Sequence, residues 1–61
     1  MTRTQAITKA HELSKLTVSK MAYAIERQDG EWSTSEVCPV SYVTNHYWEI
    51  ILCKEGREYR I

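Results

Sequence analysis

A glutamate–glycine pair, Glu55–Gly56, separates two segments in which apolar and polar side chains alternate. The glycine can adopt the positive φ that a two-residue hairpin loop needs. Such a loop places Lys54 opposite Arg57 and Leu52 opposite Tyr59, so the turn chemistry and the side-chain alternation agree. The carboxyl-terminal part of the chain therefore predicts an antiparallel β-hairpin.

The hairpin register divides the side chains between two faces of a sheet. Because strands half-buried in a core alternate apolar and polar side chains, we expect the bulkier face to pack on the core. This predicted core face consists of Trp48, Ile50, Leu52, Tyr59 and Ile61. The reverse face consists of Tyr47, Glu49, Ile51, Cys53, Glu58 and Arg60. Since two of these side chains are apolar or aromatic, the reverse face is predicted to be exposed but only partly polar.

A further strand is expected over residues 37–43, returning to the hairpin through residues 44–46. Pro39 cannot donate a backbone hydrogen bond, which places this strand at a sheet edge. Trp32 either covers the junction between helix and sheet or begins a short strand of its own. The predicted sheet thus has three strands, drawn from residues 32–61.

Two registers of this edge strand against the hairpin remain open. A three-residue loop sets Cys38 opposite Leu52 on the core face. A two-residue loop sets Cys38 opposite Cys53 on the other face, the only arrangement that allows a disulfide. The first register buries more apolar surface and is preferred.

The amino-terminal half has a helical period. Thr2 and Gln5 have the spacing of a capping box, and Gly30 provides a left-handed stop. Between them, small and apolar side chains recur on one stripe at 100° per residue. The stripe consists of Ala6, Ile7, Ala10, Leu13, Ser14, Thr17, Met21, Ala24 and Ile25. We therefore expect one long helix over about residues 3–28.

A helix of this length is longer than the sheet that it would cover. About 25 residues at 1.5 Å each give a rod of roughly 37 Å, whereas a strand of seven or eight residues covers about 25 Å. Either the helix overhangs the sheet and exposes part of its apolar stripe, or it breaks within residues 16–20. Thr17 or Ser19 could cap a second helix at such a break.

These elements predict a single α+β domain over residues 1–61, with one long helix on a three-stranded antiparallel sheet. The composition, 43% hydrophobic and 26% charged, is typical of a folded chain. A domain of this size buries only about 60% of the surface of its unfolded chain. Since one helix cannot cover both faces of the sheet, we expect a homodimer.

Few residues could carry chemistry. Cys38 and Cys53 are candidate nucleophiles, with His11 or His46 as the base, but such a pair needs hydrogen-bond reach and an orienting group. The predicted hairpin keeps His46 away from Cys53. The same four residues lack the paired spacing of zinc ligands, and no serine elbow, phosphate-binding glycine loop or HExxH motif occurs. We predict no enzymatic activity, metal or cofactor.

Charge is balanced overall but divided along the chain, with a net charge of +3 in residues 1–28 and −3 in residues 29–61. The ordinary interpretation is two solvated faces that attract each other within the fold. The alternative is a basic face for an acidic partner. Lys9, Lys20 and Arg27 line one flank of the predicted helix and are the candidate nucleic-acid contacts.

The preferred hypothesis is a small interaction or regulatory module, homodimeric, that binds another protein through exposed bulky side chains. The candidate interface consists of Leu16, Tyr23, Tyr47 and Ile51. A nucleic-acid-binding regulator that uses the basic helix flank is the alternative. No apolar run approaches the roughly 20 residues that span a bilayer. The amino terminus lacks the apolar core of a signal peptide, so a cytoplasmic location is the default expectation.

Overall fold

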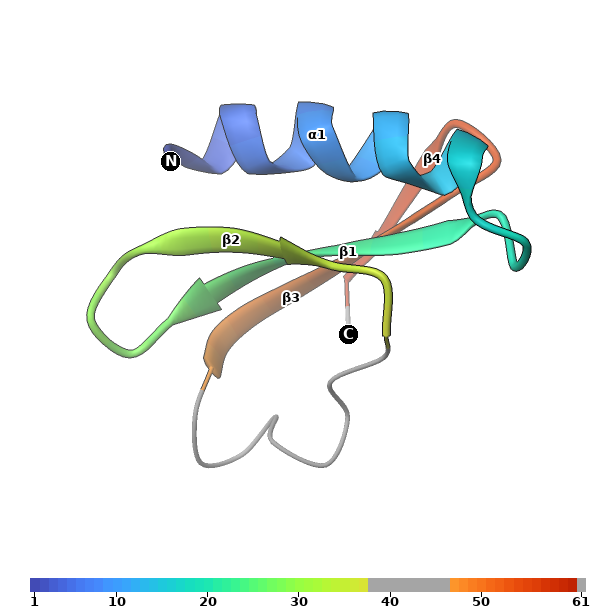
Figure 1. Cartoon of the computed structure of the whole chain (residues 1–61). Helices are drawn as coiled ribbons and strands as arrows, with labels where there is room; N and C mark the ends of the chain where they lie inside the picture. The colour runs from blue at the N-terminus through green and yellow to red at the C-terminus, as the bar shows by residue number, and fades with distance from the viewer. Residues whose placement is uncertain (38–46, 61) are drawn as a thin grey trace.

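The computed structural model describes residues 1–37 and 47–60 as one helix and four strands. The helix α1 spans Arg3–Leu16. The strands are β1 (Met21–Arg27), β2 (Trp32–Ser35), β3 (Tyr47–Lys54) and β4 (Arg57–Arg60). They form one antiparallel sheet in the order β2-β1-β3-β4, and α1 lies across one face of it (Figure 1). The predicted α+β class is confirmed, but the sheet has four strands rather than three.

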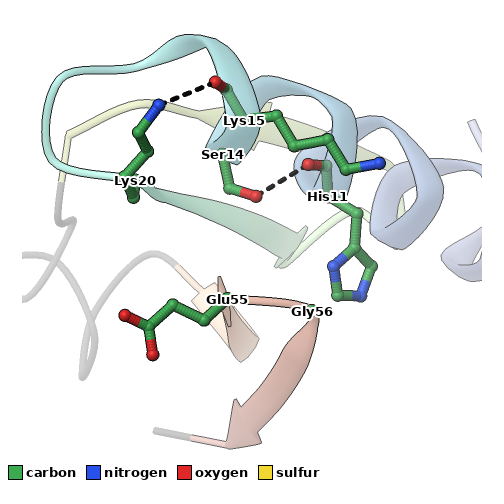
Figure 2. A pocket seen from close by; sticks show the side chains of 6 residues that line it. All are labelled: His11, Ser14, Lys15, Lys20, Glu55 and Gly56. Carbon is green, nitrogen blue, oxygen red and sulfur yellow. Dashed lines mark hydrogen bonds between the residues drawn. The ribbon is translucent and has the colours of Figure 1, made fainter.

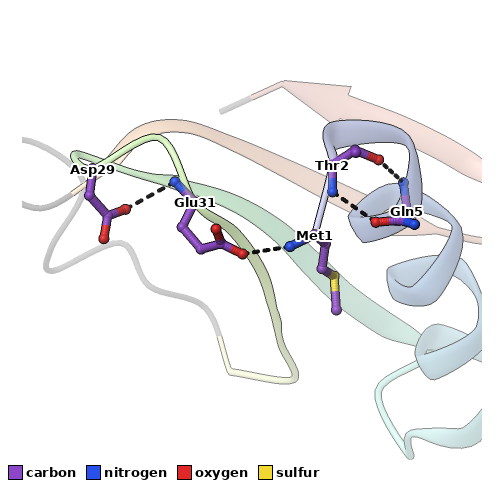
Figure 3. A network of polar contacts seen from close by, with 5 residues as sticks. All are labelled: Met1, Thr2, Gln5, Asp29 and Glu31. Atoms are coloured by element: carbon purple, nitrogen blue, oxygen red, sulfur yellow. Dashed lines mark hydrogen bonds and ion pairs between the residues drawn. The ribbon is translucent and has the colours of Figure 1, made fainter.

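The predicted capping box begins α1. The Gln5 backbone N–H donates to Thr2 Oγ1 at 3.2 Å, and the Thr2 backbone N–H donates to Gln5 Oε1 at 2.9 Å (Figure 3). At the other end, Thr17 has an extended backbone, with φ −81° and ψ 154°, and its N–H donates to the Leu13 carbonyl at 3.0 Å. The helix therefore ends at Leu16. A break within residues 16–20 was one of the two predicted alternatives.

The predicted helix over residues 3–28 is wrong in its second half, where the chain forms β1 instead. The spacing there fits a helix, but Ala22 and Ala24 also alternate with Tyr23 and Ile25 at the period of a strand. β1 pairs with β2 on one side and β3 on the other, so both of its edges are hydrogen-bonded. This pairing outweighs a local helix preference of a few tenths of a kcal/mol per residue.

The turn between β1 and β2 contains the glycine that was expected to end the helix. Gly30 has φ 86°, and its N–H donates to the Arg27 carbonyl at 2.9 Å. Trp32 then begins β2, and its side chain is buried. A short strand beginning at Trp32 was one of the two predictions made for this residue. Gly30 thus lies in a turn between two strands and does not end a helix.

The predicted hairpin is confirmed. Lys54 lies opposite Arg57 and Leu52 lies opposite Tyr59. Both loop residues of the pair Glu55–Gly56 have positive φ, 53° and 76°, as the mirror-image turn of a two-residue hairpin requires.

The second predicted neighbour of β3 is wrong. Leu52 lies opposite Tyr23 of β1, in the place that the strand over residues 37–43 was expected to occupy. With β1 on one side and β4 on the other, β3 has no edge left for that strand. Residues 38–46 and Ile61 lie outside the described residues, and with them the predicted strand itself, its proline and its return loop.

The helix covers the face of the sheet that was predicted to be the reverse face. Ile51 and Cys53 are 3% and 0% exposed, and they pack beneath α1. The cluster also contains Ala6, Ile7, Ala10, Ala22, Ala24 and Trp32. Small side chains on both the helix and β1 let the two backbones approach closely, which the bulky opposite face does not permit.

The position of α1 on this face contradicts two predictions. Ile51 is covered by the helix of its own chain, so it supplies no apolar surface for a homodimer. The helix does not overhang the sheet either, since Ile7 and Ala10 are 8% and 0% exposed. The shorter helix matches the length of the strands that it covers.

Candidate functional site: the sheet face opposite the helix

The four residues predicted to form a protein interface do not share one surface. Ile51 is buried beneath α1, while Tyr23 is 7% exposed in a separate cluster on the opposite face of the sheet. Leu16 is 81% exposed at the carboxyl end of α1. Tyr47 begins β3, opposite Arg27. The prediction that Ile51 is exposed is therefore wrong, and Tyr23 is buried as well.

The basic helix flank predicted to contact nucleic acid is also not formed. Lys9 lies on α1, Lys20 lies in the turn before β1 with φ 60°, and Arg27 is the last residue of β1. Lys20 Nζ donates to the Lys15 carbonyl at 3.2 Å. The flank required a helix that continued to residue 28, so the three cations fall on three different elements.

The structure instead gathers bulky side chains on the sheet face away from α1, called here the open face because α1 does not cover it (Figure 1). A second buried cluster of Tyr23, Ile25 and Ile50, with Leu52 packed against it, marks this face. Side chains on a strand alternate, and paired residues share a face. The alternation on β3 and the register of β4 add Trp48, Lys54, Arg57 and Tyr59 to the open face.

Exposure on the open face is uneven. Ile25 and Ile50 are 4% and 2% exposed, whereas Trp48 is 68% and Tyr59 is 45% exposed. Both are large aromatic side chains that lie exposed on strands. The open face therefore presents two aromatic anchors beside a buried aliphatic centre.

The carboxylates on the strands lie on one face of the sheet. The three glutamates on strands, Glu26, Glu49 and Glu58, alternate onto the face beneath α1. On the open face, Lys54 and Arg57 form an exposed cationic pair at one end. No described strand position on the open face carries a carboxylate.

Two of the strand carboxylates on the helix side, Glu49 and Glu58, contact basic side chains of α1. Arg3 Nε lies 3.4 Å from Glu49 Oε1, and His11 Nε2 lies 3.1 Å from Glu58 Oε1. The amino terminus contacts Glu31 beside the turn that Asp29 stabilises (Figure 3). These contacts join the positive and negative halves of the chain. Each exposed pair contributes only about 0–1 kcal/mol, so their effect is mainly on orientation.

A hollow of about 230 Å³ lies between the carboxyl end of α1 and the β3–β4 turn (Figure 2). Six residues line it: His11, Ser14, Lys15, Lys20, Glu55 and Gly56. Ser14 Oγ donates to the His11 carbonyl at 2.7 Å, so its hydroxyl is engaged with its own helix. Since His11 contacts Glu58 and not this hydroxyl, the hollow does not pair a nucleophile with a base.

The one described cysteine is a structural thiol. Cys53 is fully buried, and its Sγ lies 3.9 Å from the Ile7 carbonyl oxygen. Burial, and secondarily the charge of Glu58, raise the pKa of this thiol. A protonated thiol is a poor nucleophile and metal ligand. Of the three partners considered for it in catalysis or metal binding, Cys38 and His46 lie outside the described residues, and His11 contacts Glu58.

Two negative findings apply to the described part of the chain. No group of three or more histidine, cysteine or acidic side chains there is arranged to hold a metal ion. None of its helices combines the length and the apolar character needed to cross a bilayer.

The anchors Trp48 and Tyr59 were assigned to the core from the sequence and not to a site. The signal that would have exposed them is the pair Ala22 and Ala24, which marks β1 as a strand with one small face. A helix with a stripe of alanines fits that face best, and the anchors alternate onto the other. No protein family, curated protein or solved structure was found to match this chain.

Proposed function

We propose that this chain is a small non-catalytic module that binds another protein through its open face, and that it assembles as a homodimer. The observation that carries the proposal is the pair of exposed aromatic side chains, Trp48 and Tyr59, on a face without described carboxylates. Tryptophan and tyrosine are enriched among the residues that dominate binding energy in interfaces. The chemistry fits a partner that presents apolar pockets bordered by acidic side chains.

The two kinds of side chain contribute differently to such a complex. Burying an exposed tryptophan in a partner pocket supplies affinity, and truncation of an anchor of this kind typically costs about 2 kcal/mol or more. Lys54 and Arg57 are exposed at the rim, where charges act mainly on the association rate and on partner choice. Binding should therefore depend on Trp48 at any salt concentration and on the two cations mainly at low salt.

The test is to capture partners from the native host on immobilised protein and then to measure the affinity of the captured protein. Trp48→Ser and Tyr59→Ser should weaken that affinity by roughly 30-fold or more, which corresponds to about 2 kcal/mol. Leu16→Ser is the control, because Leu16 is also a large, exposed apolar side chain but lies on α1. Loss of binding in the control with retention in the open-face variants would overturn the proposal.

A second candidate, binding of single-stranded nucleic acid, is favoured by the same combination of exposed aromatic and cationic side chains. Bases stack on aromatic rings while cations contact phosphates. The overall charge of the chain is zero, whereas nucleic-acid-binding domains normally carry a basic excess, so we rank this candidate second.

Fluorescence anisotropy with labelled single-stranded oligonucleotides separates the two candidates. Protein binding predicts no retention of the oligonucleotide at moderate salt. An affinity that falls steeply with salt and is abolished by Lys54→Glu with Arg57→Glu would establish the second candidate instead.

A further inference from the structure

Among the four described strands β4 lies at an edge of the sheet, and its four residues are all exposed. The other edge of the sheet, β2, begins with the buried Trp32 and continues with half-buried residues. An edge strand presents a row of backbone N–H and C=O groups that another strand can pair with. β4 is thus the more accessible of the two edges.

The hairpin determines which backbone groups of β4 face outward. In a two-residue hairpin the residues that flank the loop, here Lys54 and Arg57, form a hydrogen-bonded pair. Hydrogen-bonded and non-hydrogen-bonded pairs alternate along an antiparallel ladder. The backbone groups of Tyr59 therefore point toward β3, and those of Glu58 and Arg60 point away from the sheet.

We propose that two copies of this chain pair antiparallel through β4, with Tyr59 opposite Tyr59 of the second copy. In this register Glu58 of each copy lies opposite Arg60 of the other, at both hydrogen-bonded positions. The inference rests on the homodimer part of the proposed function and names its surface.

Charge complementarity selects this register over the others. Centring the pairing on Glu58 places two glutamates opposite each other, and centring it on Arg60 places two arginines opposite each other. A register centred between two residues, for example between Glu58 and Tyr59, leaves the hydrogen bonds unformed. It sets the outward-facing backbone groups of Glu58 opposite those of Tyr59, which point toward β3. Like charges directly opposite destabilise a strand pair, whereas opposite charges stabilise it. Only the Tyr59-centred register forms two favourable charge pairs.

The charged side chains can reach across without giving up their contacts within the chain. Glu58 contacts His11 through Oε1, and Arg60 contacts Glu49 through one terminal nitrogen at 3.2 Å. A carboxylate has a second oxygen, and a guanidinium has five N–H donors. The two Tyr59 rings meet at a non-hydrogen-bonded position, where facing side chains approach most closely.

The pairing extends the sheet across the two copies and makes their open faces continuous. Tyr59 of each copy lies at the centre of this joint surface, because alternation places it on the open face. The dimer thereby doubles the surface on which a partner protein would bind.

Analytical ultracentrifugation of the isolated chain over a range of concentrations tests the proposal. Wild type should self-associate to a dimer. Glu58→Arg alone and Arg60→Glu alone should each raise the dimer dissociation constant at least tenfold. An equimolar mixture of the two variants should form a heterodimer, and the double variant E58R/R60E should dimerise like wild type, because each restores opposite charges at every pair.

Circular dichroism of each variant checks that it is folded, and the mixture supplies its own control because one interface rescues both chains. A wild type that stays monomeric throughout would overturn the proposal, as would single variants that dimerise unchanged. Since no partner is present, these results do not depend on whether the open face binds another protein.

Discussion

Ala22 and Ala24 determine which face of the sheet the helix covers. Both are fully buried against Ala6 and Ala10 of α1, which are also fully buried. Methyl groups on both surfaces allow close approach, and interiors at crystal-like packing density leave no space for larger side chains there. The alternation of β1 then directs its bulky side chains to the opposite face.

The same geometry buries Cys53 and raises the pKa of its thiol, so we expect it to react slowly. Its raised pKa means that the folded state keeps the thiol protonated where an unfolded chain would already lose the proton. In a Cys38→Ser background, which leaves one thiol in the chain, Cys53 should react with a maleimide or disulfide reagent at least 100-fold more slowly than in urea. Labelling followed by mass spectrometry measures both rates.

The pH dependence of stability follows with a definite sign. The unfolded state binds fewer protons than the folded state once the pH exceeds the ordinary thiol pKa of about 8.5. Cys53 therefore lowers the free energy of unfolding as the pH rises through that range, and has no such effect below it. In the labelling experiment with the C38S variant, equal rates for the native and the unfolded chain at neutral pH would contradict the burial of this thiol.

At the scale of elements, the features that depend on neighbouring residues could be predicted from the sequence. The capping box requires only Thr2 and Gln5, and the hairpin turn requires only Glu55 and Gly56. The end of α1 and the identity of β1 depend on pairing with strands far along the chain. Lys20 adopts a positive φ in the connection, where the sequence has no glycine or asparagine to mark a turn.

The cap offers a direct measure of local stabilisation. Thr2→Ala removes the oxygen that accepts from the Gln5 backbone N–H and should lower the free energy of unfolding by about 0.5–2 kcal/mol. Thr4→Ala is the matched control, because Thr4 is exposed within α1 and alanine is the better helix former there. Urea denaturation gives both values. An equal loss in the two variants would show that the cap contributes nothing of its own.

At the scale of the whole molecule, the chain buries apolar clusters on both faces of one sheet. One contains Ile51 and lies beneath α1, and the other contains Ile50. The protein therefore has a buried core although only one helix packs on the sheet. The prediction of a homodimer had assumed that Ile51 is uncovered, and that assumption is wrong.

The candidate site was missed for a related reason. Alternation along β3 correctly separated Ile51 from Trp48, but it does not say which set faces the helix. The larger side chains on the Trp48 face led to the prediction that this face packs against the helix. The Ile51 face packs there instead, because it fits the alanines of α1. Complementarity between two surfaces involves residues from several elements at once, and period alone does not contain it. The open face and its anchors follow only once that choice is known.

The face that α1 covers is thus the central claim, since the exposed anchors, the buried thiol and the charges available at β4 all depend on it. Nuclear Overhauser effects between methyl groups test it most directly. We expect contacts from the Ile51 methyls to the methyls of Ala6 and Ala10, with none from Leu52 to either alanine. Contacts from Leu52 to these alanines, without any from Ile51, would contradict the account. They would show that the helix packs on the opposite face of the sheet.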